Sequence, residues 1–442
     1  MTGTATGTAT GVAPASRLAR RVRFVLLVAA AIAAVASIPS FVVAPLTGHF
    51  GGPFEDFSAY LGAARSMAAG GSPYAQFNPS TVVMSGLIYP PFAALLFRPL
   101  ALLSDHSAML VWLWLNVGSA VAGAILVART ALPRSWPAIE LGILAALVFD
   151  PVTYNFWHGQ INPLLFLFLA CAYWAYVRDR QVTAGVLLGL VAGIKIAPIV
   201  FVILLIRRRW WRGTAAMLAT GAASVVLGGV ALGIRVNVTF FTQVLPDLNR
   251  ATGWIYDQSL GGTVSRLADQ SVLRVQPTSV PVQSANIVVA FAVLWLAGWA
   301  TRPGPRTPEE RGAEYGLGIL AMLLAGGIAW YPHFMHLLIP LFAVLGLVAA
   351  RGWRAERSVA LAAVGAVLVF GIVAPLAISE LTMPGLVAVS RTPAWWPLLQ
   401  LFSLPCASAV WLAVALARRL RRETVPAGSL TPVEAPVARA TA

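Results

Sequence analysis

The chain has 442 residues, of which 58% are hydrophobic and only 11% are charged, and its mean hydropathy is +0.78. With repeated apolar runs of about 20 residues, this composition is typical of a polytopic helical membrane protein rather than a soluble one. The net charge of +15 does not indicate nucleic-acid binding, because the arginines lie in short clusters between apolar runs. Cys171 and Cys406 each lie inside an apolar run, which argues against a disulfide framework or a thiolate metal site.

The first apolar run, residues 24–46, is predicted to be a retained membrane span. A basic segment precedes it and places the N-terminus in the cytoplasm. The run is too long for the apolar core of a cleaved signal peptide. Residues 1–23 and 418–442 are predicted to be disordered cytoplasmic tails, and they flank a single membrane domain, residues 24–417.

The remaining apolar runs predict an all-α protein with about twelve membrane helices and both termini inside. This topology leaves roughly 23 arginines on the cytoplasmic side and about 7 outside, the asymmetry expected of membrane proteins. The predicted spans are residues 24–46, 108–128, 138–149, 161–177, two limbs within 182–206, 214–233, 286–300, 317–330, 333–349, 359–378 and 396–417.

The first segment predicted to lie outside, residues 47–106, is too long for a turn. Phe57, Tyr60 and Leu61 fall at helical spacing in it, which predicts an amphipathic helix on the membrane surface. The apolar run at residues 92–103 is too short to cross a core of about 30 Å, so it predicts a second surface or re-entrant helix.

Residues 182–206 are flanked by arginines at both ends, so a single span would leave one basic cluster outside. Two short limbs, broken at Gly193-Ile194-Lys195-Ile196-Ala197-Pro198, would keep both clusters inside and carry Lys195 into the outer half of the membrane. This broken hairpin is the favoured interpretation, because non-helical backbone at that depth occurs where it lines a cavity. One continuous span is the alternative.

The polar side chains of the predicted outer corners suggest chemistry at the outer membrane surface. Adjacent carboxylates beside a span are costly to keep near lipid, which makes Glu55 and Asp56 the first candidates. Aromatic residues mixed with amide and carboxyl groups suit sugar rings. A transporter would instead place ionisable residues near the midplane of two similar halves, and such halves are not evident. The other candidates are Tyr60, Tyr89, His158, Gln160, Arg250, Asp257, Gln258, Trp330, His333 and His336.

Together, the motifs resemble glycosyltransferase family 87, actinobacterial membrane enzymes of the GT-C type that use polyprenyl-phosphate sugars. The resemblance covers residues 24–417 and rests on the order and spacing of five short motifs. These are Glu55-Asp56-Phe57, Tyr89-Pro90-Pro91, His158-Gly159-Gln160-Ile161-Asn162, Gly193-Ile194-Lys195-Ile196-Ala197-Pro198 followed by Arg207-Arg208-Arg209-Trp210-Trp211, and Asp257-Gln258-Ser259-Leu260.

The resemblance implies an inverting transfer of mannose from polyprenyl-phosphate mannose to a phosphatidylinositol mannoside or lipomannan type of acceptor. Asp56 would be the base that takes the proton from the acceptor hydroxyl. Lys195, His333 and Arg250 would bind the departing phosphate. No cofactor or metal is expected. The residues expected to contact the substrates are Glu55, Tyr60, Tyr89, His158, Gln160, Asp257, Gln258, Trp330 and His336.

Alternatives remain at this point. Within the family, an arabinofuranose donor is the near alternative, and outside it a transporter or flippase for a polar lipid. Asp56 could be a helix-capping or solvated carboxylate, and Lys195, the only lysine, could extend along apolar surface to reach water. Relatives often carry Asn at the position of Asp257, so a role copied onto that residue is in doubt.

Overall fold

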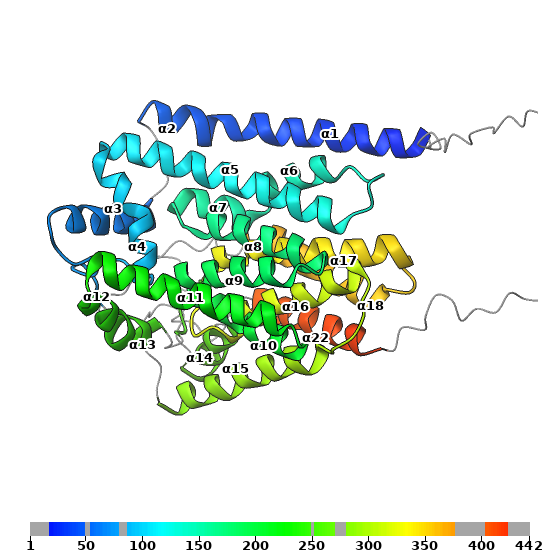
Figure 1. Ribbon diagram of the computed structural model, residues 1–442. Helices are drawn as coiled ribbons and strands as arrows, with labels where there is room; N and C mark the ends of the chain where they lie inside the picture. The colour runs from blue at the N-terminus through cyan, green and yellow to red at the C-terminus, as the bar shows by residue number, and fades with distance from the viewer. Residues whose placement is uncertain are drawn as a thin grey trace, which may run out of the picture.

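A computed structural model describes residues 17–48, 54–78, 86–248, 252–269, 280–375 and 403–422. The regular elements in these ranges are helices, apart from one isolated antiparallel bridge between Asp257 and Trp330. Figure 1 shows the long helices side by side, with the start of α1 and the end of α22 at the same end of the molecule. The predicted all-α membrane fold is confirmed. The predicted tails lie largely outside the described residues.

Five helical segments are long and apolar enough to cross a membrane. A sixth results if α6 (Ala138–Val148) and α7 (Asp150–His158), which are bent by 55° at their junction, are counted as one span. The predicted number of twelve full spans is therefore not confirmed, because other predicted spans are shorter apolar helices of 10–17 residues. The five segments are Arg23–Leu46 in α1 (Arg17–Ile38) and its continuation η1 (Pro39–Val43) and α2 (Ala44–Leu46), α5 (Asp105–Ala131), α11 (Trp211–Leu232), α15 (Val280–Ala300) and Tyr331–Arg351.

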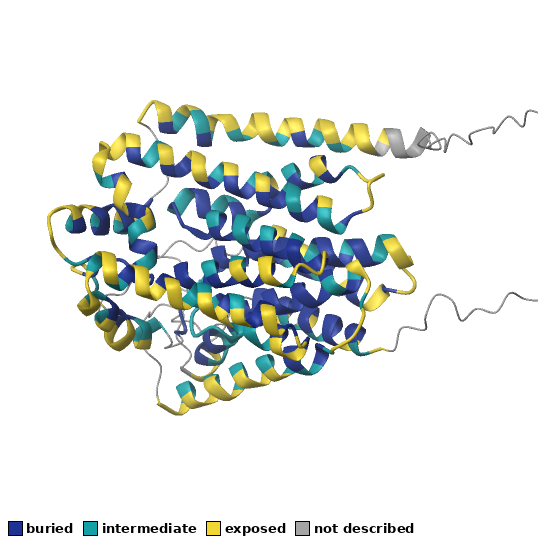
Figure 2. Cartoon of the chain, in the orientation of Figure 1, coloured by how far each residue is buried: buried dark blue, intermediate teal, exposed yellow. Residues whose placement is uncertain are grey.

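Burial separates the helices that face lipid from those at the centre. Only 11% of the apolar window is buried in Arg23–Leu46 and in α15, whereas 72% is buried in Tyr331–Arg351. Figure 2 shows the same contrast, with exposed residues along α1 and α15 and buried ones along α16 (Pro308–Ala325) and α17 (Leu338–Arg351). The exposed side chains of the outer helices are apolar, as contact with lipid requires.

The segment predicted to be a broken hairpin contains α9 (Gln181–Ile194), η3 (Ala197–Val200) and α10 (Phe201–Arg207), with Lys195 at the break. The glycines of α9 lie against α11 in parallel order: Gly185 meets the carbonyl of Gly213, and Gly189 that of Met217. Because α11 starts directly after α10, parallel packing puts the start of α9 and the end of α10 at the same end of the molecule. The chain thus reverses at Lys195, as the hairpin interpretation predicts.

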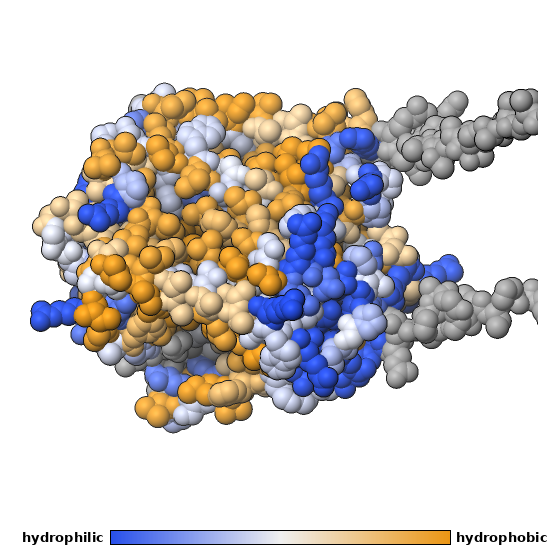
Figure 3. All heavy atoms as spheres, viewed as in Figure 1, coloured by the Kyte–Doolittle hydropathy of each residue, from blue (hydrophilic) through white to orange (hydrophobic). Residues whose placement is uncertain are grey.

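The two ends of the molecule differ in charge. One end, called here the arginine end, gathers hydrophilic side chains in Figure 3. There the ends of four helices are tied by ion pairs: Arg351 to Glu310 at 2.8 Å and Arg419 to Glu356 at 2.7 Å. The helices involved are α16, α17, α18 (Arg357–Leu368, continued by η6, Val369–Val373) and α22 (Leu404–Arg421).

The opposite end, called here the α3 end, consists of short helices (Figure 1). The predicted surface helix is α3 (Glu55–Ala68), and the predicted second short helix is α4 (Pro91–Phe97) with η2 (Arg98–Leu102). Both therefore form where the sequence pattern places them. The remaining elements of the long loop are α12 (Ile234–Thr239), η4 (Phe240–Val244), α13 (Leu245–Leu248) and, further along, α14 (Leu260–Asp269).

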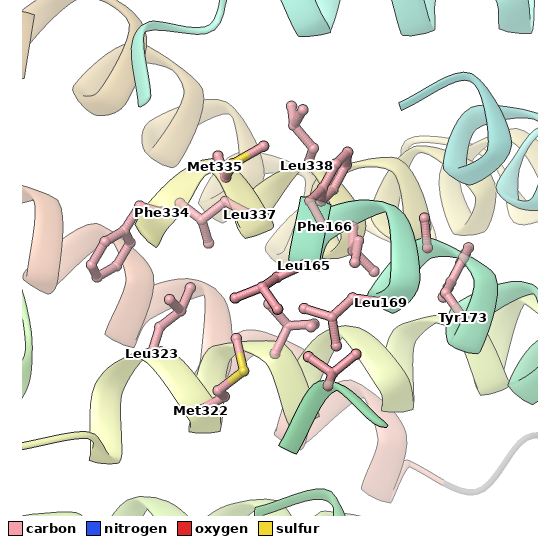
Figure 4. Close-up of a cluster of buried hydrophobic side chains, with 14 of the residues drawn as sticks. Leu165, Phe166, Leu169, Tyr173, Met322, Leu323, Phe334, Met335, Leu337 and Leu338 are labelled. Atoms are coloured by element: carbon pink, nitrogen blue, oxygen red, sulfur yellow. The ribbon is translucent and has the colours of Figure 1, made fainter. Parts of the chain in front are cut away.

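The apolar core joins three elements that contain or adjoin residues lining the candidate site. Figure 4 shows Leu165 and Leu169 of α8 (Asn162–Val177) beside Met322 of α16, with Phe334 of η5 (Tyr331–Leu337) close by. Each of these side chains is less than 10% exposed. Close packing of this kind fixes the elements relative to one another, so the side chains at their ends are held by a rigid base.

Candidate active site

Asp56 lies in the first turn of α3, next to a partly buried cavity. Phe54 precedes the helix with a φ of 47°, and its backbone N–H donates to the carbonyl of Trp157 at 3.1 Å, which fixes the start of α3 against α7. Oδ2 of Asp56 accepts a hydrogen bond from Nε2 of Gln160 at 2.8 Å. Burial raises the pKa of Asp56 from 3.8 to about 6, although the hydrogen bond from Gln160 acts in the opposite direction.

Gln160 reaches Asp56 because α7 ends in a tight turn. Gly159 has a φ of 65°, the left-handed conformation that closes the C-terminus of a helix. A Cβ at this position would lie 2.7 Å from the Cβ of Phe57, and the Gly159 carbonyl accepts from the indole of Trp112 at 2.7 Å. The His-Gly-Gln motif therefore requires glycine at its centre for backbone conformation and for close contact with α3.

Lys195 and His333 lie together on another wall of the same cavity. Nζ of Lys195 is 2.9 Å from Nε2 of His333 and donates to Oδ1 of Asn162 at 3.0 Å. The backbone N–H of Trp330 donates to Nδ1 of His333 at 3.1 Å, so a neutral imidazole carries its proton on Nε2. Two nitrogens that can each donate to an anion thus lie at one point of the cavity, which suits a phosphate oxygen.

The cavity that joins these groups has a volume of about 150 Å³. Its mixed lining of polar and apolar side chains is typical of a site for a small polar group attached to lipid. The lining includes Asp56, Tyr89, Gln160, Lys195, Trp330 and His333, together with Ile88, Phe240, Leu245 and Leu248.

Glu55 and His158 form a pair at the rim of the site. Nδ1 of His158 lies 3.1 Å from Oε1 of Glu55, whose side chain is 55% exposed. This hydrogen bond lowers the pKa of Glu55, so the carboxylate is ionised near neutral pH. The ring of His158 stacks on Tyr154 with centroids 4.2 Å apart. The two adjacent carboxylates of α3 therefore lie in different surroundings, one exposed and one directed to the cavity.

Tyr60 and His336 lie behind the lining of the cavity. Tyr60 is buried, stacks on Phe97 with centroids 4.5 Å apart, and donates to the hydroxyl of Tyr89 at 3.3 Å. His336 lines a smaller neighbouring cavity and stacks on Phe166. Tyr60 thus supports Tyr89, which lines the site, and substrate contact by Tyr60 and His336 stays a prediction.

Asp257 and Gln258 belong to a loop that pairs with the segment before η5. The carboxylate of Asp257 is fully buried and accepts from the backbone N–H groups of Ser259 and Ala329, each at 3.0 Å. Nε2 of Gln258 donates to the carbonyl of Ile255 at 2.6 Å. This geometry gives Asp257 a positioning role, because it holds the segment that carries Trp330 and His333. Arg250, the third predicted phosphate ligand, lies outside the described residues.

Two amide side chains that sequence reasoning did not select lie between the parts of the site. Asn162 donates to Oδ1 of Asn155 at 2.8 Å and also to Oε1 of Gln160, and both asparagines are fully buried. The motif His158-Gly159-Gln160-Ile161-Asn162 could have indicated Asn162, because two residues on either side of a tight turn can place their side chains next to each other. Within the described ranges, no cluster of three or more His, Cys, Asp or Glu side chains could hold a metal ion.

Comparisons with known proteins place the chain in a family. Residues 87–327 match the model of glycosyltransferase family 87. The chain is 28% identical over 425 residues to the polyprenol-phosphate-mannose-dependent α-(1-2)-phosphatidylinositol mannoside mannosyltransferase of Mycobacterium tuberculosis, covering 91% of both chains. It is 28% identical over 315 residues to the corresponding phosphatidylinositol pentamannoside mannosyltransferase of Mycolicibacterium smegmatis, covering 69% of this chain and 73% of that one. The family match spans more than half of the chain, and the protein therefore belongs to glycosyltransferase family 87.

Proposed function

We propose that the protein transfers mannose from polyprenyl-phosphate mannose to a hydroxyl of a phosphatidylinositol mannoside or lipomannan type of glycolipid, forming an α-1,2 linkage. The family makes the protein a membrane glycosyltransferase, and the named relatives are mannosyltransferases for phosphatidylinositol mannosides. The observation that carries the mechanism is that Asp56, Lys195 and His333 line one and the same cavity.

The reaction needs one proton acceptor and one anion site. The acceptor hydroxyl oxygen forms a bond to the anomeric carbon while the bond from that carbon to the phosphate oxygen breaks. Asp56 takes the hydroxyl proton. The electron pair of the broken bond leaves with the polyprenyl phosphate, whose charge Lys195 and His333 stabilise. Attack from the face opposite the phosphate inverts the configuration, so a β-linked donor gives an α-linked product.

A polyprenyl phosphate is already a good leaving group, so we propose that the transfer needs no cofactor. Two donors on the phosphate would then perform the task that a divalent cation performs in other glycosyl and phosphoryl transfers. Incubation with EDTA should leave the rate of the purified protein unchanged. Loss of transfer with EDTA, restored by a divalent cation, would contradict this part of the proposal.

The test of the main proposal is an assay with purified protein in detergent, offered polyprenyl-phosphate mannose and a phosphatidylinositol mannoside acceptor. Mass spectrometry should detect an acceptor one hexose heavier. Polyprenyl-phosphate arabinofuranose, offered in parallel, should be consumed far more slowly. A lipid transporter would give no product in detergent, because transport needs two compartments. The absence of any glycosidic product from either donor would refute the enzyme assignment.

We also propose that the α3 end faces the outside of the plasma membrane. The arginine-rich loops at the other end support this orientation. A single exposed cysteine at Ser58, on α3, should react with a membrane-impermeant maleimide in intact cells. A cysteine at Arg354, beyond α17, should react only after lysis. The reverse pattern would overturn the orientation without affecting the assigned reaction.

A further inference from the structure

Two buried carboxamide groups connect the base to the phosphate site, and a third is bonded to them from the side. Starting at the base, Gln160 donates to Asp56, Asn162 donates to Gln160, and Lys195 donates to Asn162. Asn155 is hydrogen-bonded to Asn162 from the side at 2.8 Å. Gln160 is 6% exposed and both asparagines are fully buried. Amide groups buried so deeply need partners, and here their partners are one another.

The direction of this amide chain follows from its hydrogen bonds. Nδ2 of Asn155 donates to the backbone carbonyls of Pro151 and Pro332, which can only accept. Oδ1 of Asn155 must then face Asn162, and Nδ2 of Asn162 donates hydrogen bonds to Oδ1 of Asn155 and Oε1 of Gln160. Two backbone carbonyls, one of them directly before His333, therefore fix which way each amide points.

With this polarity, every donor in the chain is turned toward the carboxylate. Oδ1 of Asn162 accepts from the ammonium of Lys195, and Nε2 of Gln160 donates to Oδ2 of Asp56. A positive charge at one end of such a chain polarises each hydrogen bond in the same direction and strengthens the last one. Carboxamides do not titrate, so the chain carries polarisation and orientation rather than protons.

We propose that Asn162 is a positioning residue that couples the donor-phosphate site to the base, and that the chain from Lys195 through Asn162 and Gln160 sets the pH range in which Asp56 is active. The inference rests on the proposed function, since it assumes that Asp56 is the base and Lys195 binds phosphate. A donor phosphate at Lys195 offsets its positive charge, weakens the polarisation and makes Asp56 a stronger base. The base thus gains strength when the leaving group is in place.

Other groups also act on Asp56 and belong in any account of its titration. Glu55, beside it on α3, raises its pKa, whereas His158 of α7 and Lys195 at the hairpin break lower it. The hydroxyl of Tyr89 lines the same cavity. Substitutions in the amide chain leave all four of these groups in place, so a change in the titration of the base can be assigned to the chain.

The experiment is the pH dependence of kcat/KM for the donor in Asn162→Leu and Gln160→Met, because this constant reports the free enzyme, in which no phosphate offsets the charge of Lys195. Both remove the amide while keeping a side chain of similar length. Gln160→Met removes the hydrogen bond to the carboxylate, and Asn162→Leu removes the link from Lys195 that polarises it, so the protonated form of Asp56 is favoured in both. We expect the acidic limb of the profile to move up by about one pH unit. Each variant should then lose about fivefold more activity near pH 6 than near pH 8.

Asn116→Leu is the matched control. Asn116 is a buried amide of α5 with no hydrogen-bond partner among the described residues, so its profile should keep the position of the parent protein. An equal loss of activity at every pH in Asn162→Leu would reduce Asn162 to a structural role and overturn the inference. An unchanged profile in Gln160→Met would overturn it as well, and this variant decides if Asn162→Leu does not fold. If the parent protein forms no product at all, the proposed function fails instead.

Discussion

Replacement of Asp56 by Asn is the most direct test of the mechanism. The carboxamide has the shape of the carboxylate and retains an oxygen that accepts from Gln160, which lies 2.8 Å from Oδ2. Folding and the cavity should therefore change little, whereas the proton acceptor is lost. A general base contributes about 10²- to 10⁴-fold in rate, equivalent to about 2.7–5.5 kcal/mol in the activation barrier. We expect kcat to fall by that factor.

The assay is the rate of mannosyl transfer in detergent over a range of donor concentrations, together with a thermal melting curve. KM for the donor should stay within about threefold, since the phosphate site is intact. Asp105→Asn is the matched control, because Asp105 is an exposed carboxylate that pairs with Arg65 at the same end of the molecule. It should retain full activity. If Asp56→Asn keeps more than a tenth of the parent kcat, Asp56 is not the base.

Three further predictions concern the other parts of the site. Lys195→Met should lower kcat/KM roughly 10- to 150-fold, because a hydrogen bond to a charged group contributes about 1.5–3 kcal/mol. Its control is Arg235→Met, which removes an exposed cation at the same end and should have little effect on kcat/KM. Gly159→Ala should destabilise the protein by at least about 1 kcal/mol, which is the cost of a left-handed residue with a Cβ, and it should reduce the rate of transfer. Gly118→Ala in α5 is its control: a Cβ there meets nothing within 4 Å, so the melting temperature should rise slightly. Asp257→Ala should destabilise the protein by about 1–3 kcal/mol for each backbone N–H group left without a partner. Asp257→Asn should lower the melting temperature less than Asp257→Ala does.

The sequence allowed the fold class and the hairpin break to be predicted for clear physical reasons. Long apolar runs need helices in lipid, and arginines on both sides of residues 182–206 require the chain to return to its starting end. The structure has its break at Lys195, inside the predicted motif. The number of full spans was not predictable in this way. Residues 138–149 form a short helix bent by 55° against the next one, and hydropathy does not record such a bend.

The site was predicted in part. Residues such as Asp56, Gln160 and His333 lie together because each is near the end of a helix at the α3 end. A topology predicted from the sequence is enough to place helix ends on the same side. The amide chain was not predicted, because it depends on the orientation of Asn155 toward a carbonyl 177 residues away. Substrate contact by Asp257 stays a prediction; that its buried carboxylate accepts from the backbone N–H groups of Ser259 and Ala329 could not be predicted from the sequence.

The separation of Asp56 from Lys195 has a physical reason. No ion pair joins them in the described part of the chain, and the buried amides lie between them. A direct ion pair would lower the pKa of the carboxylate by about 1–3 units and make it a poor base. It would also occupy the ammonium that the phosphate needs. With the amides between them, the pKa of Asp56 is about 6, close to the pH at which a base works best. Shortening this connection would therefore weaken the base and block the anion site together.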